Sequence, residues 1–319
     1  MELPLEGGDM KQVVFGTGPI GATLADQLAA AGHKTIAVNR SGRASTGSGV
    51  ELVAGDAADP TFTVSVSEGA EVIYQVLNPP YTRWPELFPP LQTGLLVAAR
   101  ATGAKLVTLD NMYGYGPTGP TPITEDLPYR ATGRKGRVRA EMAKELMAAH
   151  VTGDARISIG RASDYFGPGG LISHMGERVF RPALAGKKAQ VMGDPDQPHT
   201  FSYIPDIAAG LAKLGSDSRA DGRVWHLPNA PTVTTRRFID RVYEAAGTPV
   251  GISAMPRAMV GLIGVFNANL REVKEVLFEF EEPFVVDSSA FESTFEQAAT
   301  SLDEAIPATV AWFKANPKS

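Results

Sequence analysis

The stretch VVFGTGPIG at residues 13–21 decides the fold of this chain. A β-branched and aromatic run ends there in Gly-x-Gly-x-x-Gly, and an apolar pattern of helical spacing follows at once, which predicts a strand, a tight turn and a helix. Gly16 permits the turn, Gly18 lets a dinucleotide pyrophosphate approach the backbone, and Gly21 lets the helix pack close to the sheet. The N–H groups at the helix N-terminus would bind the pyrophosphate. We therefore predict a dinucleotide site, with a purely structural turn as the less favoured alternative.

The bulk composition is that of a globular chain. It has 319 residues, of which 43% are hydrophobic and 20% charged, enough for a large core and two lobes. The net charge of −5 argues against nucleic acid as the main partner. The absence of cysteine excludes disulfides, thiolate nucleophiles and Cys-ligated zinc, and the five scattered histidines predict no metal site. The sequence motifs of serine hydrolases, zinc proteases and P-loop nucleotide hydrolases are also absent.

Two segments bear on the location of the protein. Residues 1–9 lack the basic start and the long apolar core of a signal peptide, and residues 258–266, the longest apolar stretch, are too short to span a membrane. We expect a cytoplasmic protein with no membrane partner.

Strand and helix patterns alternate along the first half of the chain. Such alternation predicts an α/β fold with a doubly wound parallel sheet of the Rossmann type. After Gly167 glycine and proline become frequent, and from Thr234 the pattern is mostly helical with one extended stretch at 283–286. We expect a dinucleotide-binding Rossmann domain over 10–167 and a smaller, mainly substrate-binding C-terminal lobe over 168–319, with 201–227 folding back onto the first domain. The predicted strands after the first are 34–38, 50–54, 71–77, 105–109, 156–160 and 224–227.

The loop after the second predicted strand indicates which dinucleotide binds. An acidic residue there accepts a hydrogen bond from the ribose 2′-OH of NAD, whereas an arginine accommodates the 2′-phosphate of NADP. This chain reads NRSGR at residues 39–43 and has no carboxylate before Glu51. Arg40 and Arg43 therefore favour NADP(H), with a solvated basic loop as the alternative. The predicted cofactor-binding residues are Gly16, Gly18, Pro19, Ile20, Gly21, Asn39, Arg40, Ser41, Arg43, Asp56 and Leu77. Of these, Asp56 would either touch adenine or form a simple turn.

Further motifs accompany the glycine turn along the chain. They are Gly55-Asp56, Tyr115-Gly116, Thr124-Glu125-Asp126, Arg161 with Gly167-Pro168, and residues 201–208. With these motifs the chain resembles the extended short-chain dehydrogenase/reductases, the NAD-dependent epimerase/dehydratase family, from about Gln12 to the C-terminus. The resemblance implies a seven-stranded sheet of order 3-2-1-4-5-6-7 with a small C-terminal substrate lobe, and it leaves a homodimer open.

One departure from the family concerns its catalytic pair. Members carry Tyr-x-x-x-Lys at the start of the helix after the fifth strand: the tyrosine gives or takes the substrate proton, and the lysine lowers the pKa of the tyrosine and holds the nicotinamide ribose. Here Glu141 favours a register that puts Gly133 and Arg137 at the two positions. A shifted register puts Lys135 and Arg139 there instead. Neither register contains a tyrosine.

A tyrosine at another place is our candidate for the missing acid/base. The family's catalytic Ser/Thr at the end of the fifth strand is replaced by Asp110 and Asn111, and Tyr113 follows closely. Asn111 can bind a carbonyl oxygen but cannot relay a proton, whereas Tyr113 can do both. We predict Tyr113 as the acid/base, Asn111 as the group that orients the oxygen, and Arg137 as the cation that favours the phenolate and holds the ribose or a phosphate. The alternative is that Tyr113 only packs against the cofactor or lines the pocket.

Four further side chains are candidate substrate contacts. Asp164 and Tyr165 follow the sixth strand, where ligands bind in such sheets, and Asp164 sits where the family often has a substrate-contacting asparagine. Tyr81 and Trp84 could cap a flat substrate or serve as packing anchors. Two histidines of the second lobe, for which a structural role is favoured over substrate contact, are His174 and His199.

We interpret the chain as an NADPH-dependent reductase of a small carbonyl or conjugated carbonyl compound. A sugar-nucleotide epimerase or dehydratase is a second hypothesis, weakened because such enzymes depend on Tyr-x-x-x-Lys. A non-catalytic NADP(H)-binding sensor is a third. The expected partner is a small-molecule substrate, which the second lobe does not identify by any motif.

Overall fold

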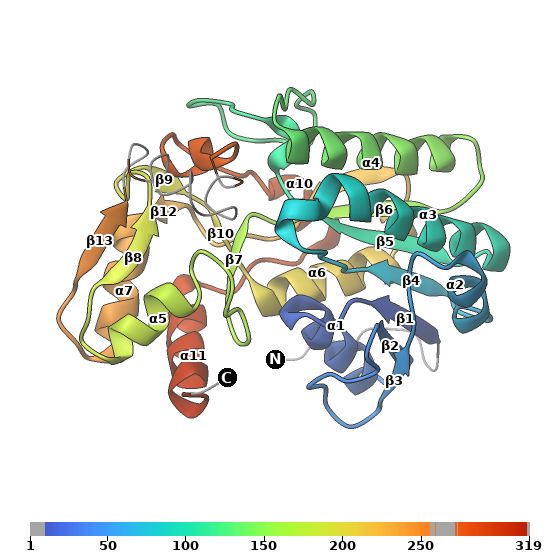
Figure 1. Cartoon of the computed structure of the whole chain (residues 1–319), viewed down its shortest axis with the longest axis horizontal. Helices are drawn as coiled ribbons and strands as arrows, with labels where there is room; N and C mark the ends of the chain where they lie inside the picture. Colours follow the sequence, from blue (N-terminus) through green and yellow to red (C-terminus); the bar gives the residue numbers. More distant parts are fainter. Residues whose placement is uncertain (1–9, 256–258, 260–271, 273, 318–319) are drawn as a thin grey trace. The chain divides into compact units, whose positions relative to one another are not determined.

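The computed structural model of the chain describes residues 10–255, 259, 272 and 274–317 (Figure 1). Of the two segments that bear on location, residues 1–9 lie outside the described residues, as do 258 and 260–266. None of the helices in the described ranges combines the length and the apolar character that crossing a membrane requires. The chain divides into two compact units. The first consists of Met1–Gly114, Lys135–Arg161 and Ile207–Leu227, and the second of Tyr115–Arg134, Ala162–Asp206 and Pro228–Ser319.

A seven-stranded sheet, parallel throughout, forms the centre of the first unit (Figure 1). Its strands are β1 (Lys11–Phe15), β2 (Lys34–Asn39), β3 (Val50–Ala54), β4 (Val72–Gln75), β5 (Lys105–Asp110), β6 (Ile157–Arg161) and β11 (Arg223–His226). Their order across the sheet is β3-β2-β1-β4-β5-β6-β11, which is the order 3-2-1-4-5-6-7 that the family resemblance implies. The predicted doubly wound, Rossmann-type fold is therefore confirmed.

The central strands of this sheet are buried on both faces. Val13, Val14 and Phe15 of β1 are completely inaccessible to solvent, as are Leu106 and Val107 of β5. A parallel sheet covered by helices on both faces requires such continuous apolar runs. The edge strand β3 alternates between exposed and half-buried residues.

Local signals set the ends of the helices that connect these strands. The helices are α1 (Pro19–Ala30), α2 (Pro60–Val66), α3 (Trp84–Thr102), α4 (Arg134–Val151) and α6 (Ile204–Ser216). Pro19 occupies the first position of α1, where the N–H that proline lacks has no intrahelical partner to lose. The carboxylate of Asp59 caps α2 by accepting hydrogen bonds from the N–H groups of Thr61 and Phe62. Gly103 ends α3 in the left-handed conformation, with a φ of 73°.

The second unit combines short paired strands with helices around an aromatic core. Its strand pairs are β7 (Asp164–Phe166) with β10 (Phe201–Tyr203), β8 (Ala189–Met192) with β13 (Ile252–Met255), and β9 (Pro198–His199) with β12 (Val233–Thr234). Its helices include α5 (Glu177–Leu184), α7 (Thr235–Ala246), α10 (Ser289–Phe295) and α11 (Leu302–Ala315). Phe180 and Phe313 stack in the core with ring centres 5.0 Å apart. The predicted extended stretch at 283–286 forms isolated bridges, in which Phe284 pairs with His199 and Val286 with Ile123.

A buried ionic cluster joins α4 to the carboxyl ends of β5 and β6. Asp110, the last residue of β5, accepts hydrogen bonds from Nε of Arg139 (2.6 Å) and Nε of Arg161 (2.9 Å). Arg139 also donates to the carbonyl oxygen of Leu109, and its guanidinium carbon lies 4.5 Å from the ring centre of Phe88. Burial raises the pKa of Asp110, but the charges of the two guanidinium groups outweigh this effect and hold the pKa below its ordinary value.

Replacing Asp110 by Asn should lower the free energy of unfolding by roughly 3–5 kcal/mol, because two buried guanidinium groups then lack a counter-charge. Asp154, which pairs with Arg100 on the surface, provides the control, and Asp154→Asn should cost about 0–1 kcal/mol. The pKa of Asp110 is lowered in the folded state, so its stabilisation is present at neutral pH and is lost as the pH falls through the folded-state pKa. Urea unfolding of both variants over a series of pH values measures these effects. Equal losses for the two variants would contradict the assignment.

Candidate functional site

The three glycines of the turn after β1 differ in what surrounds them. A Cβ on Gly16 would lie 2.4 Å from the carbonyl oxygen of Val76, and the φ of Gly16 is +108°. A Cβ on Gly21 would lie 1.9 Å from the carbonyl oxygen of Gly16, so α1 can pack on the turn only with glycine there. Around Gly18 a Cβ would meet nothing within 4 Å, and no side chain of the described residues caps α1. The start of α1 therefore has both the space and the uncapped N–H groups that a pyrophosphate requires.

Other residues of the predicted cofactor set have defined places around this turn. The backbone nitrogen of Leu77 lies 3.0 Å from the Cβ position of Gly16, so Leu77 adjoins the turn. Ile20 is buried, which leaves only its backbone for contact with a ligand, and Pro19 starts the helix. The carboxylate of Asp56 accepts a hydrogen bond (2.9 Å) from the N–H two residues further on. Asp56 thus forms the simple turn that the sequence left open as an alternative; contact with adenine stays a prediction.

The loop after β2 is built around the side chain of Asn39. Its amide nitrogen donates to Oγ1 of Thr17 (2.5 Å) and to the carbonyl oxygen of Arg43 (2.9 Å). Its Oδ1 accepts a hydrogen bond from the N–H of Ser41 (2.9 Å), so the side chain ties the loop to the glycine turn. Arg40 and Arg43 are exposed, and neither guanidinium group has an ion pair or a hydrogen bond with any described residue. The loop thus presents two cations suited to a phosphate.

In the first turns of α4 the two residues of the shifted register are buried, whereas Arg137 of the other register is exposed. Lys135 is 1% and Arg139 5% exposed, so these two side chains, four residues apart, occupy the buried face of the helix. Arg137 is exposed, and a Cβ on Gly133 would lie 3.1 Å from the side chain of Glu275. Because Arg139 is already engaged by Asp110, Lys135 is the buried cation of this face that the ionic cluster does not use.

A cluster of aromatic side chains surrounds Tyr113 in the first unit. The hydroxyl of Tyr81 donates to the hydroxyl of Tyr113 at 3.4 Å, and Nζ of Lys135 lies 4.4 Å from the ring centre of Tyr81. The carbonyl oxygen of the Asn111 side chain accepts a hydrogen bond from the N–H of Tyr113 (3.1 Å), which fixes the short turn. Trp84 is only 5% exposed and stacks on Tyr113 with ring centres 5.8 Å apart. These contacts make the ring of Trp84 a packing anchor, which is the alternative that the sequence left open, and contact with a substrate stays a prediction.

In the second unit, Asp164 belongs to a buried polar cluster. Its Oδ2 lies 2.9 Å from Nε2 of His199, whose Nδ1 lies 3.0 Å from the carbonyl oxygen of Glu279. Burial raises the pKa of Asp164, but the hydrogen bond from His199 outweighs this effect and holds the pKa below its ordinary value. Burial and the charge of Asp164 raise the pKa of the Glu279 carboxyl well above its ordinary value, and they also raise that of the Tyr165 phenol.

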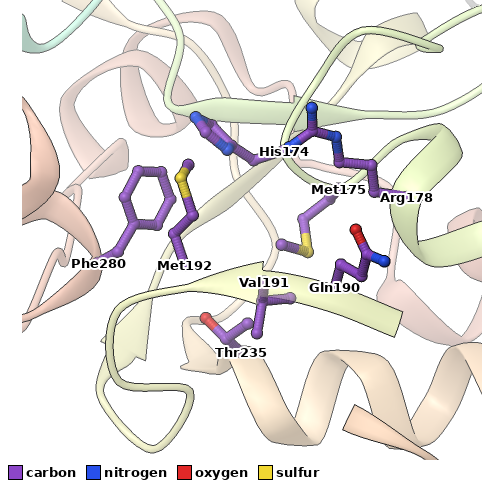
Figure 2. A pocket seen from close by; sticks show the side chains of 8 residues that line it. All are labelled: His174, Met175, Arg178, Gln190, Val191, Met192, Thr235 and Phe280. Atoms are coloured by element: carbon purple, nitrogen blue, oxygen red, sulfur yellow. The ribbon is translucent and has the colours of Figure 1, made fainter. Parts of the chain in front are cut away.

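A small pocket lies beside His174 in the same unit (Figure 2). Its volume of about 20 Å³ has room for one water molecule. The ring centres of His174 and Phe280 lie 4.5 Å apart. Burial lowers the pKa of His174, although the charge of Asp164 opposes this effect. The residues that line the pocket are His174, Met175, Arg178, Gln190, Val191, Met192, Thr235 and Phe280.

We did not predict Glu279 as a functional residue from the sequence. One signal was available, because Glu279 is the single charged residue in the apolar run VLFEF at 276–280 and a carboxyl group is seldom buried without a specific reason. The hydrogen bond between its carbonyl oxygen and His199, and the effect of the Asp164 charge on its pKa, could not be predicted, because they join segments far apart in the chain. The predicted cofactor residues, together with Tyr81, Trp84, Asn111, Tyr113 and Arg137, belong to the first unit; Asp164 and Tyr165 belong to the second.

A matched pair of glycine variants tests the assignment of the turn. Gly16→Ala should lower the free energy of unfolding by roughly 1–3 kcal/mol, since alanine is strained at this φ and would collide with the backbone. Gly18→Ala should change stability by less than about 1 kcal/mol but weaken dinucleotide binding, because its methyl group enters the space predicted for the pyrophosphate. Urea unfolding and a fluorescence titration with NADPH measure the two effects. Unchanged NADPH affinity in a stable Gly18→Ala variant would contradict the assignment.

Comparison with solved structures finds this fold over nearly the whole chain. An epimerase from Methanothermobacter thermautotrophicus superposes with a TM-score of 0.81 at 17% identity, over 98% of this chain and 94% of the other. The UDP-N-acetylglucosamine 4-epimerase of Methanobrevibacter ruminantium gives a TM-score of 0.80 at 15% identity, over 97% and 100% of the two chains. The dTDP-glucose 4,6-dehydratase of Bacillus anthracis in complex with NAD gives 0.78 at 15% identity, over 97% and 98%. At these identities the similarity concerns the fold.

A comparison with curated proteins found no match. A comparison with sequence families gives a match that starts at the strand before the glycine turn. It covers residues 13–227, more than half of the chain, and includes the whole run from β1 to β11 except the first two residues of β1. The chain belongs to the NAD-dependent epimerase/dehydratase family.

Proposed function

We propose that this protein is a nicotinamide dinucleotide-dependent enzyme that acts on a sugar nucleotide, as an epimerase or a dehydratase. The observation that carries the proposal is the glycine turn, with uncapped N–H groups and space around Gly18, in a chain of the epimerase/dehydratase family. Proteins of the same fold that act on UDP- and dTDP-linked sugars support this choice. The sugar-nucleotide hypothesis therefore moves ahead of the reductase that the sequence favoured.

We propose NADP(H) as the cofactor. When bound, its nicotinamide would supply a hydride acceptor or donor for a carbon of the substrate. Arg40 and Arg43 would bind the 2′-phosphate, because both are exposed and neither has an acidic partner among the residues described. Asn39 stands where an acidic residue would bind the ribose of NAD, and its side chain is occupied in holding the loop. The Bacillus anthracis dehydratase, in contrast, was determined with NAD.

In the proposed reaction Tyr113 exchanges a proton with a hydroxyl group of the sugar. Oxidation of an alcohol removes a hydride from carbon and a proton from oxygen, so a group that accepts the proton is required. The hydrogen bond between Tyr81 and Tyr113 gives the proton a second carrier, and the ammonium group of Lys135 adds positive charge beside the pair. Asn111 would orient the substrate oxygen, and the exposed Arg137 would hold an anionic group of the ligand.

The second unit would supply most of the substrate-binding lobe, as the predicted segment 168–319 implies. Asp164 and Tyr165 are our candidates for substrate contact there, and Asp164 is an anion with part of its side chain exposed. We expect the enzyme to work in the cytoplasm on a small-molecule substrate.

A reductase of a small carbonyl compound is the second candidate. The observation that favours it is the first turn of α4, which contains no tyrosine and buries Lys135 instead. A reductase transfers hydride in one direction only, so it depends less on a group that serves as base and acid in turn.

Arginine variants of the β2 loop test the cofactor. Arg40→Ala and Arg43→Ala should each weaken NADPH binding by roughly 10- to 100-fold, the effect of losing a charged hydrogen bond to phosphate, and leave NADH binding unchanged. Arg100→Ala, which removes a surface cation elsewhere in the first unit, should change neither affinity. Isothermal titration calorimetry with NADPH and NADH measures these affinities. If wild-type protein binds NADH more tightly than NADPH, the cofactor assignment is wrong.

Incubation with sugar nucleotides tests the reaction. UDP-glucose, UDP-N-acetylglucosamine and dTDP-glucose should be offered with NADP⁺ and the products separated by chromatography, where we expect an epimer or a 4-keto-6-deoxy sugar.

Tyr113→Phe should lower kcat roughly 10²- to 10⁴-fold without changing NADPH affinity, because it removes the group that carries the proton. Tyr129→Phe, at a half-buried tyrosine whose ring centre lies 5.8 Å from that of Tyr115, is the matched control and should retain kcat. Oxidation of NADPH by ketones or enones, with sugar nucleotides unchanged, would favour the reductase, and NADPH binding without any turnover would favour a sensor.

A further inference from the structure

His199 has a hydrogen-bond partner at each of its two ring nitrogens. The side chain is 1% exposed; Nε2 lies 2.9 Å from Oδ2 of Asp164, and Nδ1 lies 3.0 Å from the carbonyl oxygen of Glu279. A carbonyl oxygen can only accept a hydrogen bond, so Nδ1 carries a hydrogen. One proton remains to be placed between Nε2 and Asp164. It gives either an imidazolium facing a carboxylate or a neutral imidazole facing a carboxylic acid.

Three phenylalanine rings stack on the imidazole ring. The ring centres lie 4.6 Å away for Phe201, 5.3 Å for Phe280 and 5.0 Å for Phe284, with interplanar angles of 27°, 6° and 28°. The faces of aromatic rings carry negative partial charge and attract cations placed over them. The aromatic surroundings of His199 therefore favour the imidazolium.

The other titratable groups around the pair are consistent with one anion and one cation. Burial, opposed by the charge of Asp164, lowers the pKa of His174, while Arg178 on α5 lowers it further, so His174 stays neutral at pH 7. Glu279 is 2% exposed and its Oε1 has no partner among the described residues. Burial and the charge of Asp164 raise the pKa of its carboxyl well above the ordinary value, which favours the neutral form. Two carboxyl groups in one buried region do not both ionise, and here Asp164 is the one held as an anion by His199.

Only one carboxylate oxygen of Asp164 is engaged by the protein. His199 binds Oδ2, whereas Oδ1 accepts no hydrogen bond from any described residue. The side chain is 17% exposed, so a ligand can reach it. An accessible carboxylate oxygen in a partly dry site is a strong acceptor for hydroxyl groups.

We propose that His199 is a positioning residue: as an imidazolium it holds Asp164 ionised and oriented, so that Oδ1 accepts a hydrogen bond from a hydroxyl group of the substrate. The ligand chemistry is that of a polyol, such as the sugar of a sugar nucleotide, and in this respect the inference rests on the proposed function. Asp164 is the group that touches the ligand, and His199 acts through it.

The protonation of the pair can be measured without any ligand. In the full-length protein with ¹⁵N-labelled histidine, both ring nitrogens of His199 should carry hydrogen while Asp164 is ionised, with His199→Gln identifying the signal. In Asp164→Asn the same ring should become neutral with the hydrogen on Nδ1, because its counter-charge is gone. A wild-type ring that is neutral at pH 7 would overturn the proposal.

Two substitutions of His199 separate its two contacts. The amide of His199→Gln can reach Asp164 in place of Nε2, whereas that of His199→Asn can reach only the Glu279 carbonyl in place of Nδ1. UDP-glucose affinity should fall roughly 10-fold or more in Asp164→Asn and His199→Asn, the effect of losing one charged hydrogen bond, and should be largely retained in His199→Gln. Affinity for UDP, which lacks the hydroxyl groups of glucose, should not change in any of these variants. Equal losses for UDP and UDP-glucose would indicate a structural role and overturn the proposal.

The pH dependence of UDP-glucose binding adds a readout that misfolding does not imitate. Without the imidazolium, the pKa of Asp164 should rise. In His199→Asn, the loss of UDP-glucose binding on acidification should therefore begin at a pH roughly one to three units higher than in the wild type. Identical pH profiles would overturn the positioning role. If the wild type bound no sugar nucleotide at any pH, the proposed function and the hydroxyl contact would both fail, while the labelled-histidine experiment would still decide the charge of the pair.

Discussion

The close approach of two backbone segments at the start of α1 is the constraint on which the first unit depends. A Cβ on Gly21 would lie 1.9 Å from the carbonyl oxygen of Gly16, so no other residue allows α1 to sit this near to the turn. The same turn is tied to both neighbours of β1, through hydrogen bonds from Gly16 to Val38 and from Val76 to Phe15. The space around Gly18 and the uncapped helix start follow from this packing. The geometry that we propose for dinucleotide binding at this place is therefore a consequence of how the helix meets the sheet.

The buried ionic cluster of Asp110, Arg139 and Arg161 is the second feature that organises the first unit, because it occupies side chains that could otherwise contact a ligand. Asp110 engages Arg139 and Arg161 at the carboxyl ends of β5 and β6, so Arg139 is committed to holding α4 against the sheet. A buried ion pair adds little stability over an apolar contact but is costly to break, which makes such a cluster a poor place for a mobile ligand contact. Lys135, one helical turn earlier on the same face, lies over Tyr81 instead. Lys135 and Arg139, which have the Tyr-x-x-x-Lys spacing in the shifted register, are thus two cations with different surroundings.

The fold could be predicted from the sequence because its signals are local. Buried parallel strands appear as continuous apolar runs, and β2, β3 and β5 begin at the residues predicted for them. The site could be predicted only in part. Which face of α4 is buried depends on Asp110 and Tyr81, which contact Arg139 and Lys135 and are distant from them in sequence. The pairing of Asp164 with His199 joins two short strand segments, and no periodicity in either of them encodes it.

The proton-handling groups of this protein are best understood from the cost of burying them. Glu279 has a buried oxygen without a partner, and such a group costs about 1–3 kcal/mol that an apolar residue would avoid. A carboxyl group kept neutral close to Asp164 does not compete with it for His199, so the single negative charge stays on the residue whose second oxygen is accessible. Packing alone has no need for this division between two carboxyl groups. One ionised acceptor without a second negative charge beside it suits the neutral, hydroxyl-bearing ligand that we propose, because a charged acceptor forms the stronger hydrogen bond.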